Sequence, residues 1–183
     1  MIIKRSCAVL LLAACSPLSE QAKDPAIGRN GGFEAVRDEL PVNWLVYTPG
    51  TIPRGSYTLS FDSADFKEGK QSLHFDVQEC SGEPGWRSPG IAQELPARAG
   101  SKYRVSFWIK SAGCEWSASA GGVSAKTGDM SELASYDPAL VGWQYVEREV
   151  ALSPRSDRLR FELNLGSPGK LWIDAVRMLA VGE

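Results

Sequence analysis

Regular alternation of apolar and polar residues is the feature of this sequence that most restricts its fold. The alternating runs cover residues 72–77, 103–110 and 158–165. Because successive side chains of a β-strand point to opposite faces of a sheet, each run predicts a strand with one buried face. Turn residues separate the runs, and the segment from Met130 to Ala134 is expected within a long loop. No stretch shows sustained helical periodicity, so the sequence predicts an all-β sandwich or barrel.

Composition narrows the class of protein. The chain has 183 residues, which suits one domain with a short extra segment. Hydrophobic residues make up 43% and charged residues 23%, which is typical of a globular protein and argues against disorder. Lysine and arginine number 20 against 22 acidic residues. Since no cationic surplus is present to neutralise phosphates, we expect no nucleic acid partner.

The first residues have the form of a secretion signal. Lys4 and Arg5 precede an apolar stretch that is too short for a membrane span, which needs about 20 residues. Its end, Leu12-Ala13-Ala14-Cys15, resembles the lipobox of bacterial lipoproteins. The resemblance implies a signal peptide over residues 1–14 and a lipid on Cys15. An ordinary signal peptide that contains a cysteine is the alternative.

The sorting signal and the tether follow from the same segment. Ser16, rather than aspartate, follows the cysteine. A serine at this position resembles the outer-membrane sorting signal of Gram-negative lipoproteins. We therefore expect the protein to be located in the cell envelope, attached to the outer membrane by its lipid. Residues 15–29 are expected to form a lipidated, flexible tether, and residues 30–183 a single domain.

Two cysteines remain in the expected domain, Cys80 and Cys114. An exported chain folds in an oxidising compartment, so a disulfide between them is expected. Two separate free thiols are the alternative. No Cys-x-x-Cys spacing points to zinc or redox chemistry.

Six short motifs follow one another in a recognisable order. They lie at residues 30–34, 41–44, 69–73, 100–110, 142–144 and 171–176. The succession resembles carbohydrate-binding modules of the family 4, 9 and 22 type. This resemblance implies a galactose-binding-like jelly-roll β-sandwich of two antiparallel sheets, with a non-catalytic, glycan-binding role.

The same resemblance implies a structural calcium ion near the opening motif and the last strand. Calcium takes six to eight oxygen ligands. By motif, Glu34 and Asp174 would supply carboxylates, and Gly32 with either Lys70 or Gln71 would supply backbone carbonyls. Ala175 stands where the family often has a second acidic residue. Without metal, the two carboxylates would accept backbone hydrogen bonds.

Trp108 is the main candidate for stacking on a sugar ring. Its neighbours in the strand belong to the inward set, so Trp108 should point outward with Arg104. Trp86 and Trp116 lie in polar segments and would form the rim of a cleft. If their strands are adjacent, further polar residues share the face of Trp108: His74, Gln93, Glu162 and Asn164. Alternatively, a loop covers Trp108, and the other two tryptophans shield the core.

No residue pattern indicates catalysis. The acidic pairs of the chain have no spacing that marks a facing acid and base, and the single histidine has no nucleophile motif beside it. The sequence therefore predicts a lipid-anchored, non-catalytic protein that binds a glycan on a concave sheet face or its rim loops. A protein–protein interaction module of the envelope is the alternative, because charged residues crowd the outward faces.

Overall fold

The computed structural model describes residues 29–47, 52, 55–81, 87–125 and 128–182. These residues form twelve β-strands. The strands are β1 (Val36–Arg37), β2 (Leu40–Pro41), β3 (Leu45–Tyr47), β4 (Gly55–Asp62), β5 (Ser72–Cys80), β6 (Gly90–Pro96), β7 (Lys102–Ala112), β8 (Trp116–Val123), β9 (Gly128–Ser135), β10 (Gln144–Ala151), β11 (Arg158–Leu165) and β12 (Gly169–Ala180).

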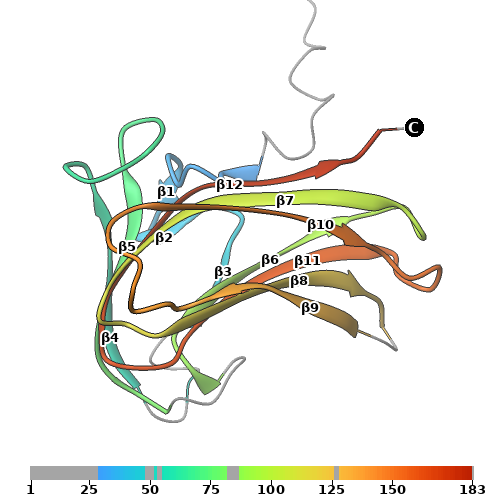
Figure 1. The fold of residues 1–183 in the computed structure, drawn as a ribbon. Coiled ribbons are helices and arrows are strands. Elements are labelled where there is room, and N and C mark those ends of the chain that lie inside the picture. The colour runs from blue at the N-terminus through green and yellow to red at the C-terminus, as the bar shows by residue number, and fades with distance from the viewer. Residues whose placement is uncertain (1–28, 48–51, 53–54, 82–86, 126–127, 183) are drawn as a thin grey trace, which may run out of the picture.

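Ten of the strands build two stacked sheets. The first sheet has the order β10-β7-β12-β5-β4, and the second sheet has the order β3-β6-β11-β8-β9. Neighbouring strands pair antiparallel in both sheets. Both sheets arch, and the outer face of the second sheet lies on the inner side of the arch (Figure 1). The predicted all-β jelly-roll sandwich is confirmed.

The hydrophobic core lies between the two sheets, as the alternation of apolar and polar residues predicted. The apolar members of the three predicted runs are buried, including Phe107 of β7 and Phe161 of β11, which have no exposed surface, except that Tyr103 is partly buried. Their ring centroids lie 5.4 Å apart at an interplanar angle of 66°. This edge-to-face contact joins one sheet to the other and fixes which residues of each strand remain outside.

One expected loop is a strand. Residues 128–135 form β9, at the edge of the second sheet, so the expectation of a loop around Met130–Ala134 is wrong. β9 pairs with β8 across a register shift between Ala118 and Ser119. Because the shift interrupts the alternation, and only Leu133 of the strand is buried, the sequence carries little strand signal there.

The described part of the chain does not test every expectation. The expected signal peptide, Cys15 and nearly all of the expected tether lie outside the described residues. Among the residues that are described, no helix is long and apolar enough to cross a membrane.

Candidate functional site

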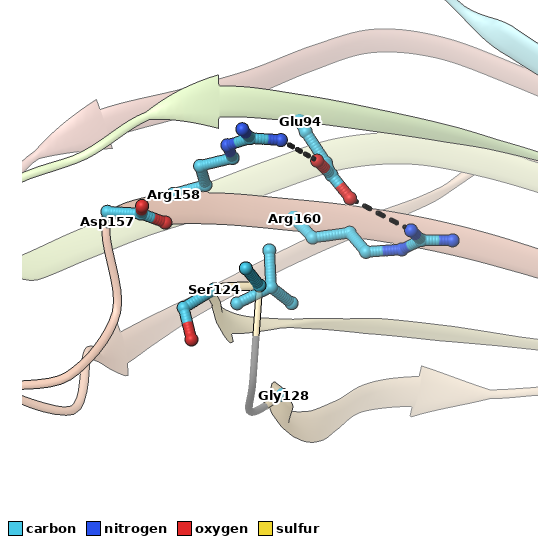
Figure 2. Close-up of a pocket in the computed structure, with 8 residues that line it drawn as sticks. Glu94, Ser124, Gly128, Asp157, Arg158 and Arg160 are labelled. Atoms are coloured by element: carbon cyan, nitrogen blue, oxygen red, sulfur yellow. Dashed lines mark hydrogen bonds and ion pairs between the residues drawn. The ribbon is translucent and has the colours of Figure 1, made fainter.

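A groove crosses the outer face of the second sheet. Two cavities, of about 510 and 310 Å³, lie along it. The larger is lined by residues of β6, β8, β9 and β11, and the smaller by residues of β3, β6 and β11. Glu94 and Arg160 line both cavities, so this pair stands between them. Figure 2 shows the larger cavity, with Arg158 and Arg160 both directed toward Glu94.

Strand register places these charged side chains outside. On β11, Leu159, Phe161 and Leu163 are fully buried, so Arg160 and Glu162 between them face outward. Across the strand pairs, Arg160 lies opposite Glu94 on one side and Gly121 on the other. Glu162 lies opposite Ala92 and Ser119. These small residues leave open space beside the charged ones.

The groove charges form a closed network with one tyrosine. Arg160 donates to Glu94 Oε1 at 2.9 Å and to Glu162 Oε2 at 3.2 Å. Its Nη2 also donates to the Tyr47 hydroxyl at 2.8 Å. Tyr47 in turn donates to Glu162 Oε1 at 2.8 Å. Arg158 donates to the free oxygen of Glu94 at 3.2 Å. Each charged group is therefore fixed by at least one partner.

The electrostatics of this groove network are balanced. Two guanidinium groups face two carboxylates, so the four charges cancel. Burial and the neighbouring Glu162 carboxylate raise the pKa of Tyr47. The phenol therefore stays protonated near neutral pH and remains a donor. The network offers fixed donors and acceptors without a net charge of its own, and Asp157 adds one further carboxylate to the lining of the larger cavity.

Among the sequence-predicted residues that the structure describes, Glu162 and Asn164 hold outward positions on this sheet, and Gln93 lines the smaller cavity. Glu162 and Asn164 are both on β11, and Asn164 is largely buried opposite Gly90 and Ser117. Gln93 points inward from β6, and its amide donates to the backbone carbonyls of Arg29 and Asn43 at 2.9 and 2.8 Å. Gln93 nevertheless lines the smaller cavity beside Asn43 and Glu94, so its expected part in ligand binding stays a prediction.

Trp116 is also a core residue. It begins β8 and pairs with Leu165, whose side chain is fully buried. Only 5% of Trp116 is exposed. The expected exposed loop position is wrong, because the strand starts at this residue and turns its ring inward. Trp86 lies outside the described residues.

Trp108, Arg104 and His74 lie on the opposite side of the sandwich. β7 and β5 belong to the first sheet, whereas β6 and β11 belong to the second. The expected common face is therefore wrong for Gln93, Glu162 and Asn164, whereas Trp108 and His74 do share the outer face of the first sheet. Lys67 places its ammonium 4.3 Å from the centroid of the Trp108 ring, and the ring of Tyr145 lies 5.2 Å away. A sugar ring would have to displace Lys67 to stack on that face of the indole.

The outer face of the first sheet holds a second aromatic pair. His74 stacks on Trp172 with ring centroids 4.5 Å apart. Burial lowers the pKa of His74, and its Nδ1 lies 3.1 Å from Ser60 Oγ. The Trp172 indole donates to Asp62 at 2.8 Å, and Lys110 lies 4.0 Å from the Trp172 ring. These rings are engaged by neighbours of the same chain.

The residues of the expected calcium site do come together. Asp174 is fully buried, and its carboxylate accepts hydrogen bonds from the backbone amides of Lys67, Glu68 and Ala175 at 2.6–2.9 Å. Burial raises its pKa. Glu34 Oε1 accepts from the amides of Lys70 and Gln71 at 2.7 and 3.3 Å.

Both carboxylates flank the same glycine. A Cβ at Gly32 would lie 3.8 Å from Glu34 Cγ and 3.9 Å from Asp174 Oδ1. Lys70 and Gln71 turn their amide hydrogens toward Glu34, so the cluster already has donors for its negative charge. The described residues hold no group of three or more His, Cys, Asp or Glu side chains placed to bind a metal. The calcium ion stays a prediction.

Several solved structures with a similar fold are carbohydrate-binding modules. A xylan-binding CBM22-1 domain of Paenibacillus barcinonensis Xyn10C matches with a TM-score of 0.58 and 13% identity, over 84% of this chain and 93% of that one. A CBM4 module matches with a TM-score of 0.58 and 14% identity, over 83% and 98%. The fold is that of a carbohydrate-binding module.

A further match lies within a larger enzyme. The CBM22-1–GH10 modules of the Clostridium thermocellum xylanase Xyn10B match with a TM-score of 0.57 and 13% identity, over 75% of this chain. This chain spans only 26% of that protein. No protein-family model matches the sequence, and no curated protein matches it. The likeness therefore shows the fold of the module.

Sequence reasoning missed four members of the groove network. Arg160 and Arg158 were visible as charged positions of an alternating run, but nothing assigned them to a site. Glu94 and Tyr47 gave no signal, because their place in the groove depends on β6 and β3 pairing beside β11. The sequence pattern does not reveal the order of strands in a sheet, which is what brings these residues together.

The two cysteines of the module are free thiols in the structure. Cys114 is fully buried, and burial, with a contribution from Cys80, raises its pKa to about 12. The expected disulfide stays a prediction.

Proposed function

We propose that the module binds a neutral glycan in the groove of the second sheet and performs no catalysis. The observation that carries this proposal is the hydrogen-bonded network of Tyr47, Glu94, Arg160 and Glu162, with a cavity on each side of it. Sugar hydroxyls both donate and accept hydrogen bonds, so they suit a surface that carries fixed donors and acceptors.

The chemistry of the groove favours hydrogen bonding over stacking. None of the described residues that line the two cavities is aromatic. Leu45, 58% exposed at the rim of the smaller cavity, supplies an apolar contact. Carboxylate oxygens of Glu94 and Glu162 keep acceptor capacity for ligand hydroxyls. Because the network is ordered before binding, little side-chain entropy is lost on association.

Two further observations support a glycan over a charged ligand. The four network charges cancel, and the remaining carboxylate of Asp157 in the larger cavity disfavours an anionic ligand. The similar solved structures include domains described as xylan-binding, and they share the fold. The proposal extends that class of ligand to this chain.

A glycan array probed with the purified chain tests the proposal. We expect a reproducible hit that is lost in Glu162→Gln and kept in Glu132→Gln, an exposed carboxylate on β9 of the same sheet. Trp108→Ala should bind like the parent chain. Loss of binding in Trp108→Ala alone would move the site to the first sheet and contradict the groove. A blank array from a folded sample would contradict glycan binding.

The second candidate function is binding of an envelope protein on the outer face of the first sheet. Tyr145 is 48% exposed beside Trp108, and exposed aromatic residues are enriched at protein interfaces. Arg104 forms ion pairs with Glu147 and Glu149 on the same face. Crosslinking in cells with a photoreactive residue at position 145 would capture such a partner, whereas the glycan proposal predicts capture at position 45.

Anchorage by a lipid on Cys15 in the outer membrane is part of the proposed function. The lipobox-like end of the expected signal supports it. We expect the mature N-terminal peptide to begin at Cys15 with the added mass of acyl chains, and Cys15→Ser to release the protein from membranes. An unmodified N-terminal peptide would contradict lipidation.

A structural calcium ion is a further element of the proposal. Glu34 and Asp174 would supply carboxylates to it, and Gly32 with Lys70 or Gln71 the backbone carbonyls. An ion held by the opening motif, the 62–71 loop and β12 would stabilise the loop arrangement.

A further inference from the structure

Four exposed apolar side chains gather at one end of the first sheet. Phe66 is 39% exposed, Leu140 50%, Val141 94% and Tyr145 48%. We call these four residues the apolar tip. Phe66 lies in the loop after β4, and the other three lie in the segment that leads into β10 or at its start. Exposure of this much apolar surface at one place marks a contact surface.

Side-chain contacts hold the two segments of the apolar tip together. Asp65, next to Phe66, accepts a 2.6 Å hydrogen bond from the Trp143 indole and forms an ion pair with Lys110. Lys67, on the other side of Phe66, lies over Trp108, whose ring packs on Tyr145. The loop after β4 and the start of β10 therefore form one surface.

The far part of the apolar tip is a defined turn. The Asp137 carboxylate accepts from the Ala139 amide at 2.9 Å, and the Asp137 carbonyl accepts from the Leu140 amide at 3.1 Å. These bonds present Leu140 and Val141 outward. Since the backbone is already ordered, burying the two side chains costs little conformational entropy.

The chain enters the domain beside this surface. Gln71 Nε2 donates to the Phe33 carbonyl at 2.7 Å, and the Lys70 amide donates to Glu34. The first described residues therefore adjoin the loop that carries Phe66. Cys15 precedes Arg29 by 14 residues, which reach at most about 50 Å when fully extended. A lipid on Cys15 keeps this end of the domain within reach of a bilayer.

We infer that the apolar tip contacts the surface of the phospholipid bilayer in which the N-terminus is anchored. Apolar side chains flanked by tryptophan, tyrosine and lysine match the chemistry of the membrane interface. The contact is weak alone, and the anchor makes it effective by raising the local concentration of lipid. The inference rests on membrane anchorage and is independent of glycan binding.

This orientation has a consequence for the groove. Tyr145 of the apolar tip belongs to β10 of the first sheet and the other three residues lie in loops, whereas the groove opens on the outer face of the second sheet. The apolar tip and the two cavities share no residue. A glycan could then enter the groove without displacing lipid.

Depth-sensitive fluorescence tests the contact in the full chain. The chain is reconstituted into phosphatidylcholine vesicles with an environment-sensitive label at Val141→Cys, and in parallel at Glu132→Cys on the second sheet as the matched control. The signal of the unsubstituted chain is subtracted. We expect spin-labelled phosphatidylcholine to quench the label at 141 several times more than the label at 132.

A second pair of variants separates a specific contact from proximity. Phe66→Ser with Leu140→Ser should reduce quenching at 141 to the level at 132, whereas Leu45→Ser, an equally exposed residue of the second sheet, should leave quenching at 141 unchanged. Near-ultraviolet circular dichroism verifies that each variant is folded. Equal quenching at the two labels, or quenching at 141 that survives the double change, overturns the inference.

Discussion

Tyr47 and Glu162 stand 115 residues apart in the sequence and share a 2.8 Å hydrogen bond in the groove. β3 carries the tyrosine and β11 the glutamate, and β6 lies between these two strands. Arg160 contacts both side chains and completes the triangle. The buried Tyr47 hydroxyl therefore holds the side chains of Glu162 and Arg160 in place through two hydrogen bonds.

Tyr47→Phe removes this support while keeping the ring. We expect the free energy of unfolding to fall by about 1–2 kcal/mol, because one hydroxyl serves two charged partners. Glycan affinity should fall by about tenfold as Glu162 and Arg160 lose their fixed positions. Chemical denaturation and titration calorimetry with the array hit measure both effects.

Tyr103→Phe is the matched control for this change. The Tyr103 hydroxyl accepts from the Arg98 amide at 3.1 Å, and Tyr103 lies on the first sheet. Glycan affinity should be unchanged in Tyr103→Phe. Unchanged affinity in Tyr47→Phe would show that the network does not position the ligand-binding groups.

Asp65 makes stability depend on pH. The hydrogen bond from Lys110, assisted by the one from Trp143, lowers the pKa of Asp65 below its ordinary value of 3.8. Between the two pKa values the unfolded chain binds more protons than the folded one, so stability rises with pH there. The contribution of Asp65 is complete above 3.8 and is lost as pH falls through the lowered value.

Asp65→Asn isolates this contribution. We expect the Tm of the parent chain to exceed that of the variant near neutral pH, with the difference shrinking as pH falls below 3.8. Lys110→Met should shrink the pH dependence in the same way, because it removes the cation that lowers the pKa. A Tm difference that stays constant over the whole range would rule out this titration as its source.

The alternating runs predicted the strands well and the binding face poorly. Leu159, Phe161 and Leu163 are buried as the pattern required. Alternation says which side chains of one strand share a face, but not which strands share a sheet. Trp108 and Glu162 were therefore grouped together, although β7 and β11 lie in different sheets.

The sequence did not predict the contacts of Tyr47 and Trp172. Tyr47 belongs to a strand of three residues, too short to show alternation. Trp172 occupies an outward position in β12 and contacts His74, Lys110 and Asp62, which come from three other strands. Such contacts depend on non-local pairing, which local pattern does not encode.

Calcium should raise the thermal stability of the chain. A ligand that binds only the folded state stabilises it by about 2.7 kcal/mol at a hundredfold excess over its dissociation constant. We therefore expect Tm to rise with calcium and fall with chelator, and the calcium-dependent difference to vanish in Glu34→Gln.

Glu34→Gln keeps an oxygen that can accept from the Lys70 amide, so its effect reports on the charge. Glu132→Gln on β9 is the control and should keep the full response to calcium. The same Tm in calcium and in chelator would exclude the calcium site. Gly69→Ala should also weaken the rise of Tm with calcium, because it displaces Glu34. A Cβ at this residue, whose φ is 72°, would collide with the Glu34 carboxylate.

Oxidation should join Cys80 to Cys114. The expected bridge would close a loop of 34 positions and stabilise the domain by about 3–4 kcal/mol on the chain-entropy estimate. Cys80 ends β5, Cys114 precedes β8, and the two thiols already influence each other in the raised pKa of Cys114. That raised pKa makes Cys114 a slow thiolate nucleophile in the folded protein, so pairing should proceed faster during folding than after it.

Peptide mapping without reductant, on chain purified from an oxidising compartment, tests the bridge. We expect one linked peptide pair and a Tm that drops on reduction to the value of Cys114→Ser, which should itself be insensitive to reductant. Cys80→Ser should behave identically, because either change removes the same bond. Alkylation of both thiols in the unreduced, unfolded chain would show that the cysteines remain separate.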